Sequence, residues 1–577
     1  MKLRIVRRLP ALGTPPLGGA LHPVLDRVYF ARGVRSTAEL DTSLGRLLPV
    51  GTLDGVTDAV ELLLAHRSGR VLIVGDFDAD GATASALMVR ALSACGFASV
   101  DFLVPNRFHF GYGLTPEIVS LAATRAPTLI VTVDNGISSN AGVAAARARG
   151  IDVLITDHHL PGAALPEANV IVNPNLRESR FGSRALAGVG VAFYVMAAVR
   201  RALEAREPGS AAGPGIAQLL DLVALGTVAD VVPLDANNRV LIAQGLKRIR
   251  AGRCVAGIRA LLGVAGRGAA DLTAADLAFA VAPRLNAAGR IDDMSIGIQC
   301  LLADDDATAQ RLAQRLDALN QERRTIEARM QQEALGALRH VDLEGGGGVR
   351  HCGLCLFDES WHQGVVGLVA SRVKDRVRRP VIAFASADQT LLRGSARSVA
   401  GIHIRDVLDA IAARRPDLIS RFGGHAMAAG LTLERAKLDE FARAFDEEVA
   451  LWAGGAADAD AVETDGELAV SEIALDTAQA LRAGGPWGQA FPEPSFDGLF
   501  SVRDARVIGE RHLKMWVEVP RSGRSFDAVA FNHLEEGGVF TPPEGLAQLV
   551  YRLEVNEYQG ERRLQLLVDH LLPAAAR

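Results

Sequence analysis

The feature that most constrains the fold of this chain is residues 71–81, Val-Leu-Ile-Val-Gly-Asp-Phe-Asp-Ala-Asp-Gly. Four apolar, mostly β-branched residues predict a buried strand of a parallel sheet. The strand leads into Asp76, Asp78 and Asp80, and a glycine then closes a turn into an apolar helix over 82–92. Alternate residues of an extended segment share a face, so the three carboxylates are expected to crowd one small volume. Like charges repel there unless a cation neutralises them, and Mg²⁺ and Mn²⁺ take oxygen ligands of this kind. A solvated acidic turn is the alternative for this motif alone.

Residues 51–175 alternate the apolar runs of strands with segments that have helical spacing. This order predicts a doubly wound parallel sheet, whose ligands gather beyond the carboxyl ends of the strands. We expect strands at 71–75, 100–104, 128–133, 153–156 and 170–172, and helices at 82–92, 116–123 and 141–149.

Ionisable side chains follow three of these strands. The first set is the aspartate cluster after 71–75, the second is Asp134, and the third is Asp157, His158 and His159. A single aspartate there could cap a helix. Three sets at one sheet edge instead favour a site for one or two divalent metal ions.

Composition limits the class of protein. A chain of 577 residues suggests three or four domains, and a net charge of −5 gives no global basic field for nucleic acid. Five cysteines make no disulfide framework, which fits a reducing compartment. The basic N-terminus has no apolar segment behind it, and no run of about eighteen uncharged apolar residues occurs. We expect a soluble, cytoplasmic protein without a membrane span.

Residues 176–298 have mostly helical patterning. An apolar helix over 216–225 ends at Gly-Thr-Val-Ala-Asp230, where the carboxylate needs either backbone N–H partners or a metal. Arg284 and Arg290 flank what is expected to be a glycine-containing turn, suited to phosphate recognition or to a structural ion pair. A long helix over 304–340 carries an apolar stripe for packing.

A second α/β domain is expected from 349 to 455, with a helix over 366–377. Residues 392–398 and 422–430 are interpreted as glycine-bearing turns, where small residues would allow a phosphate close to backbone N–H groups. A tight turn with a satisfied core histidine is the alternative for each. The pair Cys352 and Cys355 has zinc-like spacing, but it has no second pair and lies in an expected buried strand.

The remainder, 462–577, consists of short expected strands separated by turns, which predicts a small barrel of the OB type. Such barrels often hold single-stranded nucleic acid on aromatic and basic side chains. The candidates are Trp516, Phe526, Tyr558 and Arg563, with core packing as the alternative for the aromatic residues.

Four segments resemble, in order, the four motifs of the DHH phosphoesterases: residues 76–81, 133–136, 156–159 and 226–230. Four later segments, at 284–290, 361–367, 394–398 and 423–425, resemble the single-strand-specific DNA exonucleases of that family. The resemblance covers the whole chain. It implies an N-terminal extension over 1–50 packed on the first domain, a DHH catalytic domain over 51–300, a connecting helix over 301–345, a DHHA1-type substrate-binding domain over 346–455 and an OB-fold domain over 462–577.

The resemblance also implies roles for individual residues. The metal ligands would be Asp78, Asp80, Asp134, His158 and Asp230. Asp134 would bridge two ions, either Mn²⁺ or Mg²⁺, while His159 would complete the coordination or stabilise the phosphate and Asp76 would orient the ligands. Substrate would be held by Tyr112, as a base-stacking aromatic, and by Arg284 or Arg290, Ser395, Arg397 and His425.

The implied activity is hydrolysis of single-stranded DNA from its 5′ end to mononucleotides, in recombination and repair. Implied partners are a single-strand-binding protein and a helicase, and the implied state is a monomer. Two alternatives remain: a DHH enzyme for short substrates, and a non-catalytic DNA-binding scaffold. The expected C-terminal barrel disfavours the first, and the intact motifs disfavour the second.

Overall fold

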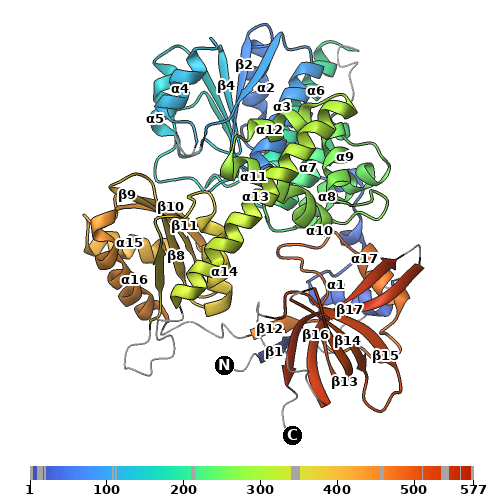
Figure 1. Cartoon of the computed structure of the whole chain (residues 1–577). Coiled ribbons are helices and arrows are strands. Elements are labelled where there is room, and N and C mark those ends of the chain that lie inside the picture. Colours follow the sequence, from blue (N-terminus) through green and yellow to red (C-terminus); the bar gives the residue numbers. More distant parts are fainter. Residues whose placement is uncertain are drawn as a thin grey trace. The chain divides into compact units, whose positions relative to one another are not determined.

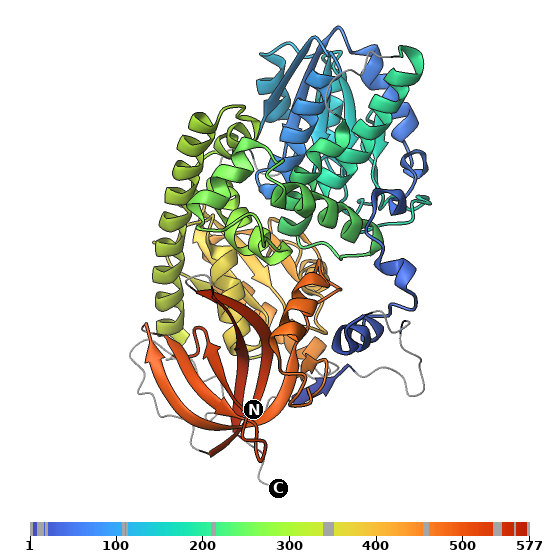
Figure 2. The same cartoon turned by 90° about the vertical axis from the view of Figure 1, so that its right-hand side faces the viewer.

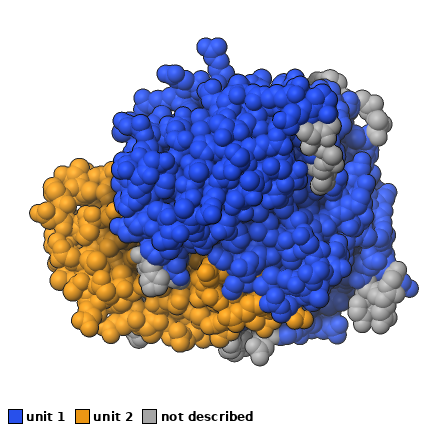
Figure 3. Space-filling view, turned by 90° about the horizontal axis from the view of Figure 1, so that it is seen from above, with its two compact units in different colours: residues 1–285, 294–313, 461–577 blue, residues 286–293, 314–460 orange. Residues whose placement is uncertain are grey.

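The computed structural model describes residues 4–8, 17, 21–106, 110, 113–208, 215–338, 351–453, 461–509, 511–534, 545–558 and 561–573. The chain forms two compact units (Figure 3). The first contains residues 1–285, 294–313 and 461–577, and the second contains 286–293 and 314–460. No helix among the described residues is long and apolar enough to cross a membrane.

A five-stranded parallel sheet organises the first unit (Figure 1). Its strands lie in the order β3-β2-β4-β5-β6, which confirms the predicted doubly wound α/β fold. The strands are β2 (Arg70–Gly75), β3 (Ser99–Leu103), β4 (Leu129–Val133), β5 (Asp152–Thr156) and β6 (Val170–Val172). Every residue of β4 is buried, as expected for a central strand with helices on both faces.

Helices cover both faces of this sheet. α4 (Pro116–Ala123) and α5 (Asn140–Arg147) lie on one face, and α2 (Val56–Ala65), α3 (Ala79–Ala94) and α6 (Gly188–Arg206) lie on the other (Figure 1). A further helical layer packs on α3 and α6. Its members are α7 (Leu220–Ala229), α8 (Ala236–Arg250), α9 (Ala256–Val264), α10 (Ala274–Asp276) and α12 (Ser295–Leu302).

Two predictions about this layer were wrong. The apolar helix does not end before the Gly-Thr-Val-Ala segment, because α7 continues through Gly226 to Ala229. The expected glycine turn around Arg284 and Arg290 is instead helix α11 (Ala282–Ile291), entered through a π-helical turn at Leu277–Val281. Pro283, which has no backbone N–H to donate, is the second residue of α11 and lies just after this π-helical turn.

The N-terminal extension was predicted to pack on the first domain, but part of it packs on C-terminal elements. β1 (Arg4–Arg7) pairs in parallel with β12 (Ala461–Thr464), and α1 (Pro23–Ala31) packs on α17 (Leu475–Ala483). The Arg7 guanidinium of β1 also forms an ion pair with the Asp497 carboxylate. β1 and α1 therefore belong with the C-terminal part of the unit.

The C-terminal strands close into a barrel, confirming the OB-type prediction (Figure 2). They are β13 (Phe496–Ile508), β14 (His512–Glu518), β15 (Ser525–Ala530), β16 (Gly545–Tyr558) and β17 (Glu561–Pro573). Trp516 is 49% exposed, whereas Phe526 is 7% exposed and belongs to the barrel core. The Arg563 side chain is exposed and pairs with Glu561, and nothing is described of the Tyr558 side chain.

The second unit is built on a five-stranded sheet in the order β10-β11-β9-β8-β7. The strands are β7 (Leu354–Phe357), β8 (Val381–Ser386), β9 (Leu391–Arg397), β10 (Arg421–Gly424) and β11 (Ala428–Glu434). Helices α14 (Val366–Val377), α15 (Ile404–Arg414) and α16 (Leu438–Ala453) pack on it, and the long helix α13 (Asp306–Leu338) contributes from residue 314 onward.

Residues 392–398 are a strand and not the predicted turn. β9 alternates buried and half-buried positions between β8 and β11, and Gly394 is required because a Cβ there would stand 2.5 Å from the Phe384 ring. The second predicted turn does exist, as the connection between β10 and β11 at residues 425–427. Cys355 lies on β7, and no described cysteine joins a group that could hold a metal. The four glycines at 345–348 lie outside the described residues.

Candidate active site

The candidate site forms because three strand ends lie at one level of the sheet. Gly75 of β2 pairs with Val133 of β4, which in turn pairs with Thr156 of β5. The next residue of each strand is an aspartate, and two histidines follow the third one. Parallel strands in this register place their following residues at one edge, so the three predicted sets of side chains meet.

The ligand atoms of seven side chains fall into three overlapping groups. Each group contains one oxygen or nitrogen from each member, all within 4.8 Å of one another. The groups are Asp76 with Asp78 and Asp134, Asp134 with His158 and His159, and Asp80 with His158 and Asp230. Carboxylate oxygens with imidazole nitrogens suit Mn²⁺ and Mg²⁺, so the donor set fits a site for such ions. The shared members, Asp134 and His158, fit two neighbouring ion positions.

The first motif is positioned by the start of α3. Asp78 is the N-cap of that helix, and its Oδ1 accepts from the backbone N–H groups of Asp80 and Gly81. Asp80, in the first turn, is 1% exposed. Burial, and then the charge of Asp78, raise the pKa of Asp80 to about 7.

The N-terminus of α6 holds the Asp80 carboxylate. The backbone N–H groups of Gly188 and Val189 donate to its two oxygens over 2.6 and 2.9 Å. A helix N-terminus suits a carboxylate because it offers unused N–H groups and a positive dipole end. Gly188 has no room for a side chain, since a Cβ there would stand 2.5 Å from that of Asp134. The sequence analysis missed both residues of α6.

Asp134 has a backbone conformation that side-chain-bearing residues rarely adopt. Its φ is 61°, in the left-handed region that aspartate and asparagine tolerate best, and its side chain is 2% exposed. Burial and the nearby carboxylates, Asp80 first, raise the pKa of Asp134 well above its usual range. A cation is therefore needed to keep this group ionised near neutral pH.

One ring nitrogen of His158 lies close to two carboxylates of the site. This atom, Nε2, lies 3.1 Å from Asp134 Oδ1 and 3.4 Å from Asp230 Oδ2. The backbone carbonyl of His158 accepts from the Asn175 side chain over 2.6 Å, which fixes this segment. A ring nitrogen between two carboxylates is consistent with a shared metal or a shared proton.

His159 is oriented by Asp157, to which the sequence analysis assigned no separate role. Asp157 Oδ1 accepts from both histidine backbone N–H groups and from His159 Nδ1 at 2.8 Å, while Oδ2 accepts from Ile137. Burial alone would lower the pKa of His159, but the hydrogen bond and charge of Asp157 raise it to about 9. Burial likewise opposes ionisation of Asp157, yet its donors bring the pKa of that group below its usual value.

Asp230 caps the C-terminus of α7. Its backbone N–H donates to Gly226, so the helix delivers the carboxylate to the site, where burial and the charge of Asp80 raise its pKa. Gly226 lets α7 approach α3, because a Cβ there would stand 2.2 Å from Thr83 Oγ1 and 2.8 Å from Asp80 Oδ1. Of the two partners considered from sequence, the structure thus places Asp230 among the candidate metal ligands.

Three predicted substrate-binding residues gather in the second unit, near the start of α14. Arg397 Nη1 donates to the Ser395 hydroxyl over 3.0 Å. Gly367 of α14 lies against both side chains, since a Cβ there would come within 2.8 Å of Ser395 Oγ and 2.9 Å of Arg397 Nη2. Arg290 Nη1 donates to the backbone carbonyl of Gly364, which lies three residues before Gly367 in the chain.

The other predicted substrate-binding residues have different positions. His425 lies in the β10–β11 connection, whose Met427 carbonyl accepts from the N–H of Ser398, directly after Arg397. Arg284 belongs to the first unit and donates to the carbonyl of Ala280. Arg290 thus lies in the same unit as the serine and arginine of β9, and the substrate contact of Arg284 stays a prediction. Tyr112 lies outside the described residues.

Family models match three parts of the chain. The N-terminal domain of the DHH family matches residues 70–227, the DHHA1 domain matches 350–451 and the RecJ OB domain matches 464–570. The protein is therefore a DHH-type protein, and its site residues from Asp76 to His159 lie within the first matched part, while Asp230 follows three residues after it.

Similar proteins define the family of this chain more closely. The chain is 54% identical to the single-stranded-DNA-specific exonuclease RecJ of Dickeya dadantii, over 98% of this chain and 99% of that one. It is 52% identical to the Escherichia coli protein of the same name, over 99% and 100%. The crystal structure of Thermus thermophilus RecJ in complex with Mn²⁺ matches with a TM-score of 0.81 at 30% identity, covering 99% of this chain and 80% of that one. A second structure of that protein is a complex with Mg²⁺. This chain belongs to the RecJ family.

Proposed function

We propose that this protein is a metal-dependent exonuclease that hydrolyses single-stranded DNA from the 5′ end to 5′-mononucleotides. The observation that carries the proposal is the convergence of five buried or half-buried carboxylates and two imidazoles at one sheet edge. Membership of the RecJ family supports the single-stranded substrate. The metal-bound Thermus relative supports Mn²⁺ or Mg²⁺ as the ions.

The chain's own residues would prepare the site for a phosphodiester. Asp78, Asp80, Asp134, His158 and Asp230 would hold the ions, with Asp134 shared between them, and Asp76 would support Asp78. Two divalent ions at such a site lower the pKa of water, neutralise phosphate charge and align attack with departure of the 3′ oxygen. His159, with its pKa raised to about 9, would be protonated at neutral pH and could donate to a phosphate oxygen.

The residues at the start of α14 would provide 5′ polarity. Ser395, Arg397 and Arg290 supply a hydroxyl and two guanidinium groups around a helix N-terminus, a combination suited to a terminal phosphate. Fixing the 5′ end would set which phosphodiester reaches the metals. His425 and Tyr112 keep their proposed substrate contacts as predictions.

The barrel would contribute affinity for long strands. Trp516 is half-exposed on β14 and offers a face on which a base can stack. Phe526 is buried and is withdrawn from this role. A single-strand-binding protein and a helicase as partners, a monomeric state, and a role in recombination and repair stay predictions.

The experiment that tests the proposal is a cleavage time course with Mn²⁺ on a long single strand, a blunt duplex and oligomers a few nucleotides long. We expect loss of the single strand and an intact duplex. Cleavage of the short oligomers alone would favour the short-substrate phosphoesterase, and cleavage of none of them would favour the DNA-binding scaffold.

The same assay tests the 5′ pocket. Arg397→Ala should reduce the preference for a 5′-phosphorylated strand and leave metal binding unchanged. A variant that prefers the 5′-phosphorylated strand as strongly as the wild type would remove Arg397 from this role.

A further inference from the structure

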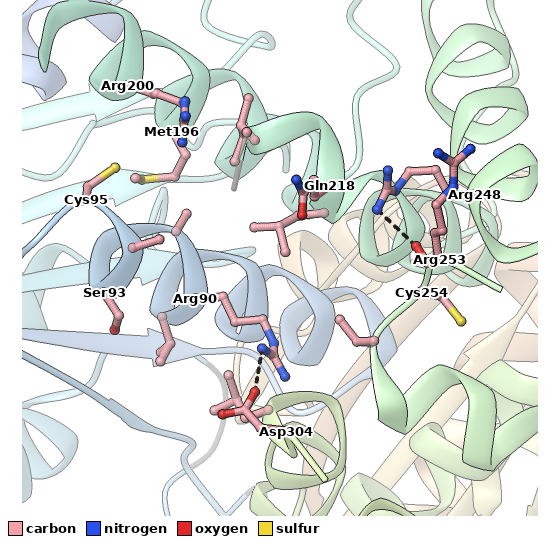
Figure 4. A pocket seen from close by; sticks show the side chains of 18 residues that line it. Arg90, Ser93, Cys95, Met196, Arg200, Gln218, Arg248, Arg253, Cys254 and Asp304 are labelled. Carbon is pink, nitrogen blue, oxygen red and sulfur yellow. Dashed lines mark hydrogen bonds and ion pairs between the residues drawn. The ribbon is translucent and has the colours of Figure 1, made fainter. Parts of the chain in front are cut away.

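A second cavity lies in the first unit, away from the carboxylates. Its volume is about 790 Å³, and it is lined by the last turns of α3, the middle of α6, the start of the α7 region and the end of α8 (Figure 4). This volume is within the range of small-molecule sites in proteins. Neither the proposed reaction nor the 5′ pocket uses any of its lining residues.

Three helices connect this cavity with the candidate active site. α3 begins at Asp78 and reaches Arg90 and Ala94 at the cavity. α6 begins with the N–H groups that hold Asp80, and the cavity lies at Met196. α7 runs the other way, from the cavity to Asp230. A rise of about 1.5 Å per residue separates the two sites by roughly 15 Å along each helix, so one ligand cannot fill both.

The charged lining of the cavity is mostly basic. It contains Arg90, Arg200, Arg248 and Arg253 but a single carboxylate, that of Asp304. That carboxylate is already paired with Arg90 over 3.0 Å, and Arg90 also donates to the carbonyls of Leu301 and Ala303. Burial raises the pKa of the Cys95 and Cys254 thiols, so neither adds negative charge. The remaining three arginines face one further carboxylate, that of buried Asp221 beside Arg248, so the cavity keeps an excess of positive charge.

Two of these arginines retain donors for a ligand. Arg248 Nη2 donates to the backbone carbonyl of Arg253 over 3.0 Å, which places the two residues side by side (Figure 4). Arg248 Nε is buried and has no hydrogen-bond partner among the described residues. The Arg253 guanidinium makes no hydrogen bond or ion pair with the described part of the chain. The exposed guanidinium of Arg253 can turn its donors toward an oxyanion in the cavity, and a phosphate fits that fork.

Most of the other side chains that line the cavity are apolar and offer surface for a ring to cover. Val89, Met196, Ile216 and Leu219 contribute aliphatic and thioether surface, and the amide of Gln218 lies between Arg200 and the Arg248–Arg253 pair (Figure 4). An inorganic anion would leave this surface uncovered. A ligand with a ring-sized body and a phosphate would use both kinds of lining.

We propose that this cavity is a second binding site of the protein, which takes a nucleoside monophosphate with its phosphate at Arg248 and Arg253 and its base on the apolar lining. Binding there requires none of the proposed metal ligands, so it is expected without divalent ions. A test of this site can therefore fail without contradicting the proposed nuclease activity, and the reverse is also true.

The test is calorimetric titration of the full chain with 5′-deoxyadenosine monophosphate in the presence of a chelator. Because the proposed 5′ pocket would also hold a terminal phosphate, the titration is made with the Arg397→Ala variant. We expect saturable binding at one site, and binding at least about ten-fold weaker for deoxyadenosine or inorganic phosphate alone, because each lacks half of the contacts. No saturable binding of the nucleotide would overturn the proposal. Inorganic phosphate binding as tightly as the nucleotide would overturn it as well.

Two variants locate the site. Arg253→Glu reverses an exposed charge at the cavity, and Ala94→Trp fills its apolar part from the exposed end of α3. Both should weaken nucleotide binding by at least about ten-fold, from charge repulsion and from lost volume respectively. The matched control is Arg201→Glu, the same charge change at an exposed α6 position outside the lining, which should bind like the wild type. Wild-type affinity in both cavity variants, or equal loss in the control, would contradict the assignment.

Discussion

The residue that defines the chemistry of this site is Asp134. Its carboxylate is shared by two of the three ligand groups, and its φ of 61° aims the side chain from the end of β4 into the site. The sequence predicts a carboxylate at this strand end. In the structure Asp134 is 1% exposed, so the choice of substitution matters.

Asp134→Asn tests the ligand role without disturbing the backbone. Asparagine tolerates the left-handed conformation, whereas alanine would be strained there. We expect cleavage of single-stranded DNA to fall by at least ~100-fold, since a neutral amide cannot hold the ions or offset their charge. Thermal stability without metal should be unchanged or higher, because a buried charge is removed. The control is Asp101→Asn on the exposed end of the sheet, and near-normal turnover in Asp134→Asn would refute the metal assignment.

The pKa values of the site predict how ion binding depends on pH. The pKa of Asp80 is raised to about 7 by burial and by Asp78, above its value in an unfolded chain. A carboxyl group of this kind stabilises the ion-free fold below about pH 4, and this contribution is lost as the pH rises through about 7. Divalent ions bind the ionised carboxylates, so they gain affinity over the same range.

The stabilisation by Mn²⁺ should therefore grow with pH. The increase in Tm at saturating Mn²⁺ is expected to be small near about pH 5 and large near about pH 8. Differential scanning calorimetry with and without the ion measures this difference. The Asp134→Asn variant should show a much smaller increase at every pH. An increase in Tm that does not change with pH would contradict the raised pKa values.

At the scale of elements, the sequence predicted the parallel sheet well because buried strands are continuous apolar runs. The expected 71–75, 128–133 and 153–156 match β2, β4 and β5 within one residue. The predictions of turns at 283–290 and 392–398 were wrong, because each rested on a glycine and not on the residues that pack around it. Gly394 is instead required for close packing within β9, and the glycine of 283–290 is tolerated within helix α11. Both outcomes depend on neighbouring residues that the sequence does not reveal.

The packing of α7 on α3 makes Gly226 a test of how helices position the ligands. Alanine favours a helix by about 1 kcal/mol over glycine, but overpacking costs about 1–3 kcal/mol. Because the new Cβ would stand 2.2 Å from Thr83 Oγ1 and 2.8 Å from Asp80 Oδ1, we expect Gly226→Ala to lower both stability and Mn²⁺ affinity.

The matched control is Gly263→Ala in α9, where a Cβ meets nothing within 4 Å. This change should stabilise the protein by up to about 1 kcal/mol through helix propensity. Chemical denaturation and calorimetric Mn²⁺ titration give the two readouts. Equal behaviour of both variants would show that helix spacing does not set the ligand geometry.

At the scale of the whole molecule, the sequence could not show that β1 and α1 belong with β12 and α17 of the C-terminal part. Nothing local indicates that β1 pairs with β12, 457 positions later, since that pairing depends on partners distant in the sequence. The contact is secured by Arg32, whose Nη1 lies 2.7 Å from Asp465 Oδ1, with both side chains almost fully buried.

Arg32→Met should therefore destabilise the first unit by roughly 3–5 kcal/mol, because it removes the nearest cationic partner of a buried carboxylate. Arg125→Met, which breaks the exposed pair with Asp101, should cost no more than about 1 kcal/mol. Urea denaturation compares the two. A small effect at Arg32 would mean that the N-terminal extension is held by other contacts.

The measurement we would make first follows a long single strand labelled at its 5′ end or at its 3′ end. With Mn²⁺ present, we predict immediate release of the 5′ label as a mononucleotide, late loss of the 3′ label, and no cleavage in the presence of a chelator. Release of the 3′ label first, products from within the strand, or equal rates with the chelator would contradict a metal-dependent 5′→3′ exonuclease.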